Sequence, residues 1–308
     1  LGYSNLGIRR IIPVLKKNFK KIEFEICSIS KSKKNIGEKK WFRNYKTALD
    51  QSNADIVYIS LQNSLHFYWA KKFLEKKYHV IVDKPATLSF SNAAKLVKIA
   101  KQNKRLLSEA TVFNYHKQIS EVLKEIKGIG NLRSVNARFV IPKLSKNNFR
   151  NITKYGGGCF NDMSPYAASI FRLFLNKKPS IKNITPIFKN KKKLNVSFSI
   201  FASYKKIDFS SYFSHDGNYQ NELIFITNKK IIRIYRAFSP PNDKKLNIFI
   251  YDKKKNKNTI KTIKKDDVFI NYFNDIFKTL KTKKFKIFYQ KLLTDSFFRE
   301  KIKKNYEN

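Results

Sequence analysis

The stretch His79-Val80-Ile81-Val82-Asp83-Lys84-Pro85 decides the fold. Three consecutive aliphatic residues without alternation predict a strand buried on both faces, which is the pattern of a parallel sheet. Proline fixes its own φ angle and disfavours a helical conformation in the residue before it, so we expect Lys84 in an extended or turn geometry. Open α/β sheets bind ligands at the carboxyl ends of their strands, where this lysine stands. A lysine at a strand end can also be an ordinary surface residue, and this stretch alone leaves both interpretations open.

The composition indicates a folded protein of more than one domain. At 308 residues the chain is long enough for two cores, and its 42% hydrophobic and 15% aromatic content excludes a disordered protein. No apolar run approaches the roughly 18 residues of a membrane span, and no basic-then-apolar leader is present. The two cysteines, Cys27 and Cys159, form no CxxC motif, and no histidine, cysteine and carboxylate group has metal-ligand spacing. We therefore expect a cytoplasmic protein without a metal or a membrane partner.

The net charge of +43 raises the question of an anionic partner. The lysines are spread along the whole chain in runs such as Lys191-Lys192-Lys193 and Lys253-Lys254-Lys255, with many Asn, Ile, Phe and Tyr residues and few Gly and Pro. This distribution indicates an AT-rich coding bias, which places lysine at solvent-exposed positions. No zinc-finger spacing, RNP-like motif or basic region with heptads supports a specific nucleic-acid partner. The positive field would still attract phosphorylated ligands.

The amino-terminal stretch Leu1-Gly2-Tyr3-Ser4-Asn5-Leu6-Gly7 is a G-x-S-x-x-G variant of the dinucleotide-binding motif, followed by a predicted helix over residues 8–18. Gly2 permits a tight turn, and we expect Gly7 to allow close helix packing. Ser4 replaces the glycine whose backbone approaches a pyrophosphate at the helix N-terminus. The strand that should precede this motif is absent and the chain starts without Met, so we expect a truncation at the first strand. The predicted cofactor contacts here are Gly2, Ser4, Asn5 and Leu6.

Repeated β–α units follow, and they predict a doubly wound parallel sheet. Strands are expected at residues 24–30, 55–60, 79–83 and 106–109, and helices at residues 45–51, 67–76 and 91–102.

The residues after the strand at 24–30 bear on the choice of cofactor. A fold of this kind that prefers NAD usually carries an acidic residue there for the ribose 2′-hydroxyl. Ser30 and Lys31 offer a hydroxyl and a cation instead, which suit a 2′-phosphate. We therefore expect NADP(H) to be favoured over NAD(H), although the lysine bias of this chain would also place lysine at this position.

From Leu132 the pattern changes to that of an α+β domain with a largely antiparallel sheet. A helix ending near residue 127 is broken by Gly128-Ile129-Gly130, and turns join most of the elements that follow. We expect a Rossmann domain over residues 1–115 and a substrate-binding domain over residues 116–308. The second domain is predicted to hold strands at 135–141, 196–201, 208–213, 222–227, 231–235 and 247–251, and helices at 163–175, 267–282 and 290–303.

Five segments in order and spacing resemble the Gfo/Idh/MocA family of NAD(P)-dependent oxidoreductases, and the likeness covers nearly the whole chain. The family usually has Glu in place of Asp83, Pro in place of Gln62 and His in place of Tyr166. A minority subgroup resembles this chain in having tyrosine there; it includes sugar-nucleotide 3-ketoreductases, glucose–fructose oxidoreductase and dimeric dihydrodiol dehydrogenase. The five segments are residues 2–7, 61–66, 83–85, 115–118 and 156–166.

Two further segments, Tyr219-Gln220-Asn221-Glu222-Leu223 and Arg236-Ala237-Phe238-Ser239-Pro240-Pro241, look like the substrate-domain sheet of nucleotide-sugar 3-ketoreductases. The family resemblance implies a homodimer or homotetramer formed through the open sheet of the second domain. It also implies further cofactor contacts at Leu61, Gln62, Asn63, His66, Asp83 and Lys84.

Reduction of a ketone by hydride needs a nicotinamide against the carbonyl carbon, positive charge near the oxygen and a proton donor. Asp162 and Tyr166 lie four residues apart in a predicted helix and therefore share one face. We expect Tyr166 to donate the proton, Lys84 to polarise the carbonyl, and Asp162 to accept hydrogen bonds from sugar hydroxyls. His116 and Arg150 are expected to contact the substrate. The alternatives are a core tyrosine at 166, a helix-start carboxylate at 162 that the dipole favours, and a structural histidine at 116.

The sequence therefore predicts an NADP(H)-dependent oxidoreductase that reduces a keto group on a sugar or sugar nucleotide. One alternative is a sugar or trans-dihydrodiol dehydrogenase that works in the oxidative direction. Another is a catalytically silent basic protein that binds polyanions, and a third is a nonfunctional fragment.

Overall fold

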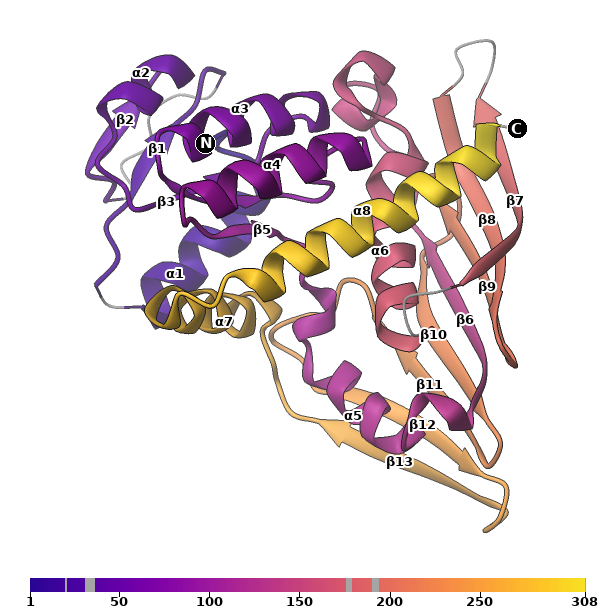
Figure 1. Ribbon diagram of the computed structural model, residues 1–308. Helices are drawn as coiled ribbons and strands as arrows, with labels where there is room; N and C mark the ends of the chain where they lie inside the picture. The colour runs from indigo at the N-terminus through magenta and orange to yellow at the C-terminus, as the bar shows by residue number, and fades with distance from the viewer. Residues whose placement is uncertain (20, 31–36, 176–178, 190–193, 308) are drawn as a thin grey trace. The chain divides into compact units, whose positions relative to one another are not determined.

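The computed structural model describes residues 1–19, 21–30, 37–175, 179–189 and 194–307 (Figure 1). The chain forms two compact units. The first comprises Leu1–Ala110 with Tyr272–Leu293, and the second comprises Thr111–Asn271 with Thr294–Asn308. The sequence led us to place the boundary at residue 115 and to assign all later residues to the second domain. The structure instead assigns Tyr272–Leu293 to the first unit.

The first unit holds parallel strands and helices, as the apolar runs predict. The central strand β4 (His79–Val82) pairs in parallel with β3 (Ile56–Ile59) on one side and with β5 (Leu107–Glu109) on the other. Val80, Ile81 and Val82 are buried, which fits a strand covered on both faces. The remaining elements are η1 (Gly7–Ile11), α1 (Ile12–Asn18), the parallel pair β1 (Glu25–Cys27) and β2 (Lys40–Phe42), α2 (Tyr45–Gln51), α3 (Asn63–Glu75), α4 (Phe90–Gln102), most of α7 (Val268–Thr282) and the first turns of α8 (Lys286–Glu307).

Leu1 and Gly2 link the β1–β2 pair to the β3–β4–β5 sheet. The Leu1 amino group donates to the Tyr58 carbonyl at 2.7 Å, and the Leu1 carbonyl accepts from the Ser60 amide at 2.9 Å. The Gly2 amide donates to the Cys27 carbonyl at 2.9 Å. These bonds follow the alternation of a parallel ladder, so the two residues bridge β1 and β3.

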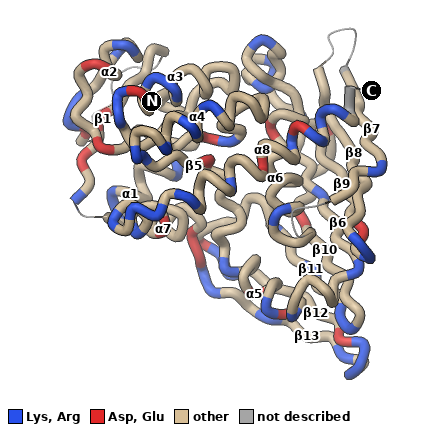
Figure 2. Tube along the Cα trace, viewed as in Figure 1, with Lys and Arg blue, Asp and Glu red and all other residues tan. Residues whose placement is uncertain are grey.

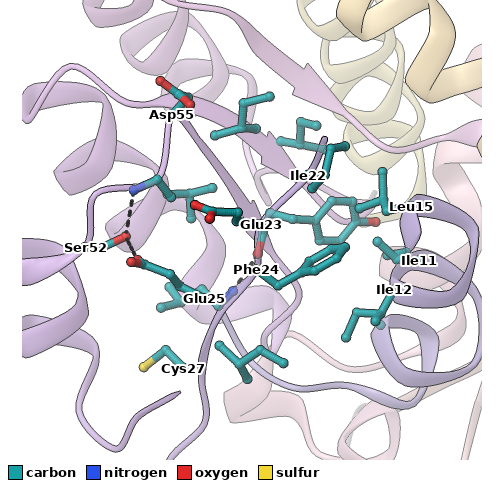
Figure 3. Close-up of a pocket in the computed structure, with 18 of the residues that line it drawn as sticks. Ile11, Ile12, Leu15, Ile22, Glu23, Phe24, Glu25, Cys27, Ser52 and Asp55 are labelled. Atoms are coloured by element: carbon teal, nitrogen blue, oxygen red, sulfur yellow. Dashed lines mark hydrogen bonds between the residues drawn. The ribbon is translucent and has the colours of Figure 1, made fainter. Parts of the chain in front are cut away.

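A groove of about 730 Å³ lies among the elements around β1 and β3 (Figure 3). Leu1 and Gly2 are among the residues that line it, together with apolar side chains of α1, β3 and α7 and the stretch before β1. Figure 3 shows Ile11, Ile12 and Leu15 on one side of this groove and Ser52 and Asp55 on the other.

The second unit is built on one large mixed sheet with strand order β13-β12-β11-β10-β6-β9-β8-β7. All neighbouring strands are antiparallel except β6 and β9, which run parallel. Helix α6 (Cys159–Phe174) packs against β8 and β9 and covers a core rich in phenylalanine, and α5 (Lys117–Ile126) packs against β11 and β12. The strands are β6 (Leu132–Val140), β7 (Ser180–Lys189), β8 (Leu194–Tyr204), β9 (Ile207–Ser214), β10 (Gln220–Thr227), β11 (Lys230–Tyr235), β12 (Leu246–Asp252) and β13 (Lys257–Ile263).

Three observed strands were not predicted, namely β2, β7 and β13. β2 has only three residues, and both β7 and β13 lie at the edges of the large sheet. Edge strands tolerate lysine and proline because one row of their backbone groups needs no partner strand. β13 is accordingly exposed over most of its length, and β7 contains Pro186. Their sequences lack the continuous apolar pattern on which the prediction relied.

Candidate active site

The turn that carries Lys84 is fixed by its neighbours in the first unit. The Asp83 amide donates to the Ile59 carbonyl at 2.9 Å, and the Ala86 amide donates to Glu109 Oε2 at 2.7 Å. The Pro85 carbonyl lies 2.8 Å from Nδ1 of His66, and the Lys84–Pro85 peptide bond is cis. The half-buried lysine therefore stands at the carboxyl end of β4, as the sequence predicts for a ligand-binding edge.

The Asp83 carboxylate connects this turn to the glycine-containing loop. The hydroxyls of Tyr58 and Ser60 both donate to it, and burial and the nearby Asp83 charge hold the pKa of the Tyr58 phenol well above its usual range. The Ser60 oxygen also lies 2.7 Å from the Ser4 hydroxyl. Asp83 was predicted to contact the cofactor, and that contact stays a prediction. What the structure shows is a carboxylate that organises the residues around it.

Gly2 and Ser4 fix the conformation of the loop at residues 2–7. Gly2 adopts a φ of +80°, and a Cβ atom built there would lie 2.4 Å from the Ser60 carbonyl oxygen, so only glycine fits. The Ser4 side chain points inward, because its hydroxyl accepts from the Gly7 amide at 3.1 Å and lies 2.7 Å from the Ser60 hydroxyl. Serine can therefore replace the middle glycine and still leave the outer side of the loop to backbone atoms and exposed Asn5 and Leu6.

The reason we gave for Gly7 was wrong. A Cβ atom at Gly7 would meet only the Ser4 hydroxyl, at 3.5 Å, which is an ordinary contact. The helix at this point packs without a close approach at Gly7.

The remaining predicted cofactor residues lie at the ends of other strands. Ser30 is exposed after β1, and Lys31 lies outside the described residues. Leu61 and Gln62 connect β3 to α3, and buried Asn63 is the first residue of that helix. Nε2 of His66 lies 3.0 Å from the Leu61 carbonyl, and burial lowers the pKa of this imidazole. His66 thus connects the loop after β3 with the Lys84 turn, and its cofactor contact stays a prediction.

In the second unit, two basic side chains hold the Asp162 carboxylate. Nε of Arg150 lies 3.0 Å from Oδ1, and Nε2 of His215 lies 3.0 Å from Oδ2. Asp162 and His215 are buried, and a carboxylate accepts only, so Nε2 of His215 carries the proton in this pair. The structure therefore brings together Arg150 and Asp162, both predicted, and adds His215.

Sequence reasoning missed His215, and no sequence signal could have found it. It follows β9, 53 positions from Asp162, without any motif around it. Only the packing of α6 against β9 places the two side chains together.

Two glycines, Gly157 and Gly158, shape the start of α6. A Cβ atom at Gly157 would lie 2.6 Å from the Arg150 carbonyl oxygen, and the Gly158 amide donates to that same oxygen at 2.7 Å. The segment with Arg150 is thereby held against the first turn of α6. The helix begins at Cys159 rather than at the predicted residue 163, so Asp162 and Tyr166 both lie within it and share a face.

The ring of Tyr166 lies in an aromatic pocket. Its centroid is 5.7 Å from that of Phe113, 5.3 Å from Phe139 and 5.1 Å from Phe238. The residue is only half-buried, unlike its three partners. This packing gives the tyrosine a defined position, and its catalytic role stays a prediction.

His116 has a structural task in the second unit. Its Nδ1 accepts from the Gln118 amide at 3.2 Å and caps α5, while Nε2 lies 3.9 Å from Asp266 Oδ2. Burial lowers the pKa of this buried imidazole. The substrate contact predicted for His116 remains untested.

The predicted catalytic residues are divided between the units, with Lys84 in the first and Asp162 and Tyr166 in the second.

Within the described ranges, no three His, Cys, Asp or Glu side chains gather in a way that could hold a metal ion. No helix in the described part of the chain is long and apolar enough to cross a membrane.

Comparison with known proteins agrees with this geometry. Residues 3–111 match the family model described as "Oxidoreductase family, NAD-binding Rossmann fold". The amino-terminal part of the chain is thus similar to the Gfo/Idh/MocA oxidoreductase family.

Two curated relatives are both dTDP-3,4-didehydro-2,6-dideoxy-alpha-D-glucose 3-reductases. The protein from Saccharopolyspora spinosa is 36% identical over 42% of this chain, and that from Streptomyces antibioticus is 24% identical over 78%. The matched stretches span 40% and 76% of the two relatives, less than two thirds of the first.

A solved structure shares the fold of the whole chain. KijD10, a 3-ketoreductase from Actinomadura kijaniata in complex with NADP and TDP-benzene, superposes with a TM-score of 0.92 at 20% identity, over 99% of this chain and 95% of that one.

The two glycines of the loop allow a matched test. Gly2→Ala should weaken NADPH binding at least about tenfold and lower the free energy of unfolding by about 1–3 kcal/mol, because the new methyl group meets backbone atoms at a positive φ. Gly7→Ala should leave binding unchanged and raise the free energy of unfolding by about 0.5–1 kcal/mol, as alanine does in a helix. Fluorescence titration with NADPH and urea unfolding measure both effects. Equal losses in the two variants would contradict this account of the loop.

Proposed function

We propose that the protein is an NADP(H)-dependent oxidoreductase that reduces a keto group on a sugar or sugar nucleotide. One observation carries this proposal most strongly. Asp162 and Tyr166 share a face of α6, with the carboxylate held by Arg150 and His215, in a chain whose residues 3–111 match an oxidoreductase family model. The names of the curated relatives, which are sugar-nucleotide 3-reductases, support the same reaction class.

Each protein group has a distinct role in this proposal. The bound NADPH supplies the hydride. Tyr166 donates a proton to the carbonyl oxygen, and the Lys84 ammonium stabilises the negative charge that develops there. Asp162 accepts hydrogen bonds from sugar hydroxyls and so orients the ring. The loop at residues 2–7 holds the pyrophosphate of the cofactor at the helix N-terminus.

The contacts of Asp162 with Arg150 and His215 explain why a carboxylate can orient the substrate. The two contacts, from Arg150 Nε and His215 Nε2, fix its rotamer before substrate arrives. Each carboxylate oxygen can accept more than one hydrogen bond, so the carboxylate can engage hydroxyls without giving up Arg150 or His215. Orientation that is fixed in advance lowers the entropic cost of reaching the reactive geometry.

Replacement of the two proposed catalytic groups should separate chemistry from cofactor binding. Tyr166→Phe and Lys84→Ala should each lower kcat for a keto-sugar nucleotide by about a hundredfold or more, because each removes one acid or electrostatic group. The dissociation constant for NADPH should stay within about threefold of wild type, because cofactor contacts through backbone atoms remain.

Two variants serve as controls for that experiment. Tyr251→Phe removes a phenol that bonds Asn256 in a hairpin, and Lys76→Ala removes an exposed lysine paired with Asp50. Both should keep wild-type rates. A near-normal rate for Tyr166→Phe would remove Tyr166 from the mechanism.

The cofactor preference forms a second part of the proposal. Ser30, exposed after β1, and Lys31 next to it suit the 2′-phosphate of NADPH. Fluorescence titration in about 0.15 M salt, which screens long-range attraction to the basic surface, should show at least about tenfold tighter binding of NADPH than of NADH. Lys31→Asp should remove this preference. Equal affinity for the two cofactors in the wild-type protein would show that these residues do not discriminate.

We also propose that the open face of the large sheet pairs two copies of the chain. Phe201, Ile231, Tyr235, Phe249 and Ile260 are exposed, and strand alternation places them opposite the face that α6 covers. Phe249 and Ile260 are cross-strand partners, and the Tyr235 ring contacts that of Phe249. These three side chains therefore form a continuous apolar stripe. Such a stripe on a soluble domain usually marks an interface.

Light scattering after size exclusion tests this pairing. The wild-type protein should elute as a dimer or tetramer, and Phe249→Lys with Ile260→Lys should give monomers, because both charges would be buried in the interface. Ile287→Lys, an equally drastic change at an exposed residue of α8, is the control and should not alter the mass. A monomeric wild-type protein would end the proposal.

A further inference from the structure

Arg236 occupies an unusual position directly after β11. Its backbone adopts a φ of +56°, and its guanidinium lies over the Tyr219 ring at 4.9 Å from the centroid. Both residues are exposed. Within the part of the chain that the structure describes, the Arg236 guanidinium forms no ion pair.

A cation without an ion pair means little by itself in a chain of net charge +43. The backbone conformation separates Arg236 from the other basic residues. The left-handed lysines stand at helix ends or in a hairpin turn, where that conformation is common, whereas Arg236 follows a strand. A bulky residue in this region is strained by about 1–2 kcal/mol and keeps that conformation only when its surroundings enforce it. Those lysines are Lys77, Lys104, Lys127, Lys205 and Lys283.

Hydrogen bonds with Asn221 hold Arg236 in this backbone conformation. Its backbone carbonyl accepts from the Arg236 amide at 2.7 Å. Its buried side chain accepts from the Phe238 amide at 2.9 Å and donates to the Tyr219 hydroxyl at 2.9 Å and to the Ser239 hydroxyl at 2.8 Å. The segment that carries Arg236 is therefore fixed at both ends.

The same network leaves a donor available to a ligand. Asn221 donates to the hydroxyl oxygens of Tyr219 and Ser239, so these two hydroxyls keep their own protons for other hydrogen bonds. The two hydroxyl oxygens lie 3.1 Å apart, and one proton can serve the bond between them. The hydroxyl that does not donate in this bond can donate its proton to a ligand beside the Arg236 guanidinium.

This group of residues lies on the same side of the sheet as Tyr166. Asn221 is the cross-strand partner of Phe139, and both side chains point to the buried face that α6 covers. Tyr219 lies just before β10, and its hydroxyl accepts from the Asn221 side chain on this face. Phe139 and Phe238 both contact the Tyr166 ring. Asn221 thus connects the Arg236 segment to Phe238, whose ring contacts that of Tyr166.

We propose that Arg236, with Tyr219 and Ser239, binds the diphosphate of a nucleotide-linked substrate. A guanidinium fork bonds two phosphate oxygens at once, and it does so best when it is fixed in advance. The stacked Tyr219 ring restricts the fork, and the hydroxyl proton supplies a further donor. This inference deepens the proposed function: Asp162 would orient the sugar, and Arg236 would hold its phosphate end.

Binding of thymidine diphosphate and uridine diphosphate tests the inference directly. Calorimetric titration should use the full chain saturated with NADPH, so that the cofactor site is filled, in about 0.15 M salt to suppress non-specific attraction. Arg236→Gly should weaken binding of either diphosphate about ten- to hundredfold, the effect of losing charge-assisted hydrogen bonds. This variant suits the left-handed backbone and should fold at least as stably as the wild-type protein. Tyr219→Ala should give a smaller loss.

Arg233→Ala is the matched control. Arg233 is exposed on the same strand, but alternation turns it to the opposite face, where its Nε lies 4.0 Å from Glu222. Its removal changes the net charge equally and should leave diphosphate affinity within about threefold of wild type. Equal losses for Arg233→Ala and Arg236→Gly would overturn the inference and leave only non-specific attraction.

The outcomes for this inference and for the proposed reaction can be told apart. Diphosphate binding that depends on Arg236, without any reduction of keto-sugar nucleotides, would support the phosphate site and reject the reaction. Reduction of free keto-sugars with no diphosphate binding would reject the phosphate site and keep the reaction. NADPH affinity should be unchanged in every variant, and its loss in Arg236→Gly would overturn the separate placement of the two sites.

Discussion

The parallel alignment of β3, β4 and β5 is the constraint on which the first unit depends. Strands that run parallel end at the same edge, so the residues that follow them must meet there. The Asp83 carboxylate uses this meeting point: hydroxyls from the end of β3 donate to it, and Ser60 passes the connection on to the glycine-containing loop. Lys84 is therefore held by the ends of several strands rather than by its own segment.

The two carboxylates that organise the units stand out because acidic residues are scarce. The chain has 22 Asp and Glu residues against 65 Lys and Arg residues, and Figure 2 shows the basic residues on helices such as α1 and α5 and on the β12–β13 hairpin. The bias towards lysine has filled the solvent positions, yet Asp83 and Asp162 each accept from two or more donors in a defined geometry. A lysine at either position would leave those donors without an acceptor, at a cost of about 1–3 kcal/mol for each buried group.

The same bias has a small effect on the backbone. Lys77, Lys104, Lys127 and Lys283 take left-handed conformations at or just after helix ends, where glycine is the usual residue. Each costs about 1 kcal/mol relative to glycine, a strain that the surrounding helices absorb. The glycines that remain at Gly2 and Gly157 are those where a side chain would collide with backbone atoms.

The sequence by itself determined the order of the elements, the parallel character of the first unit and the position of Asp162 and Tyr166 on one helix face, because these depend on local periodicity and spacing. It did not reveal β2, β7 and β13, whose residues form strands only because a neighbouring strand supplies hydrogen-bond partners. It gave the wrong reason for Gly7, because closeness of packing is a property of the facing surface. Only the tertiary structure decided that His215 holds Asp162 and that Tyr219 supports Arg236. Such contacts join segments distant in the chain, and the free energy that places them comes from packing across the sheet rather than from any local pattern.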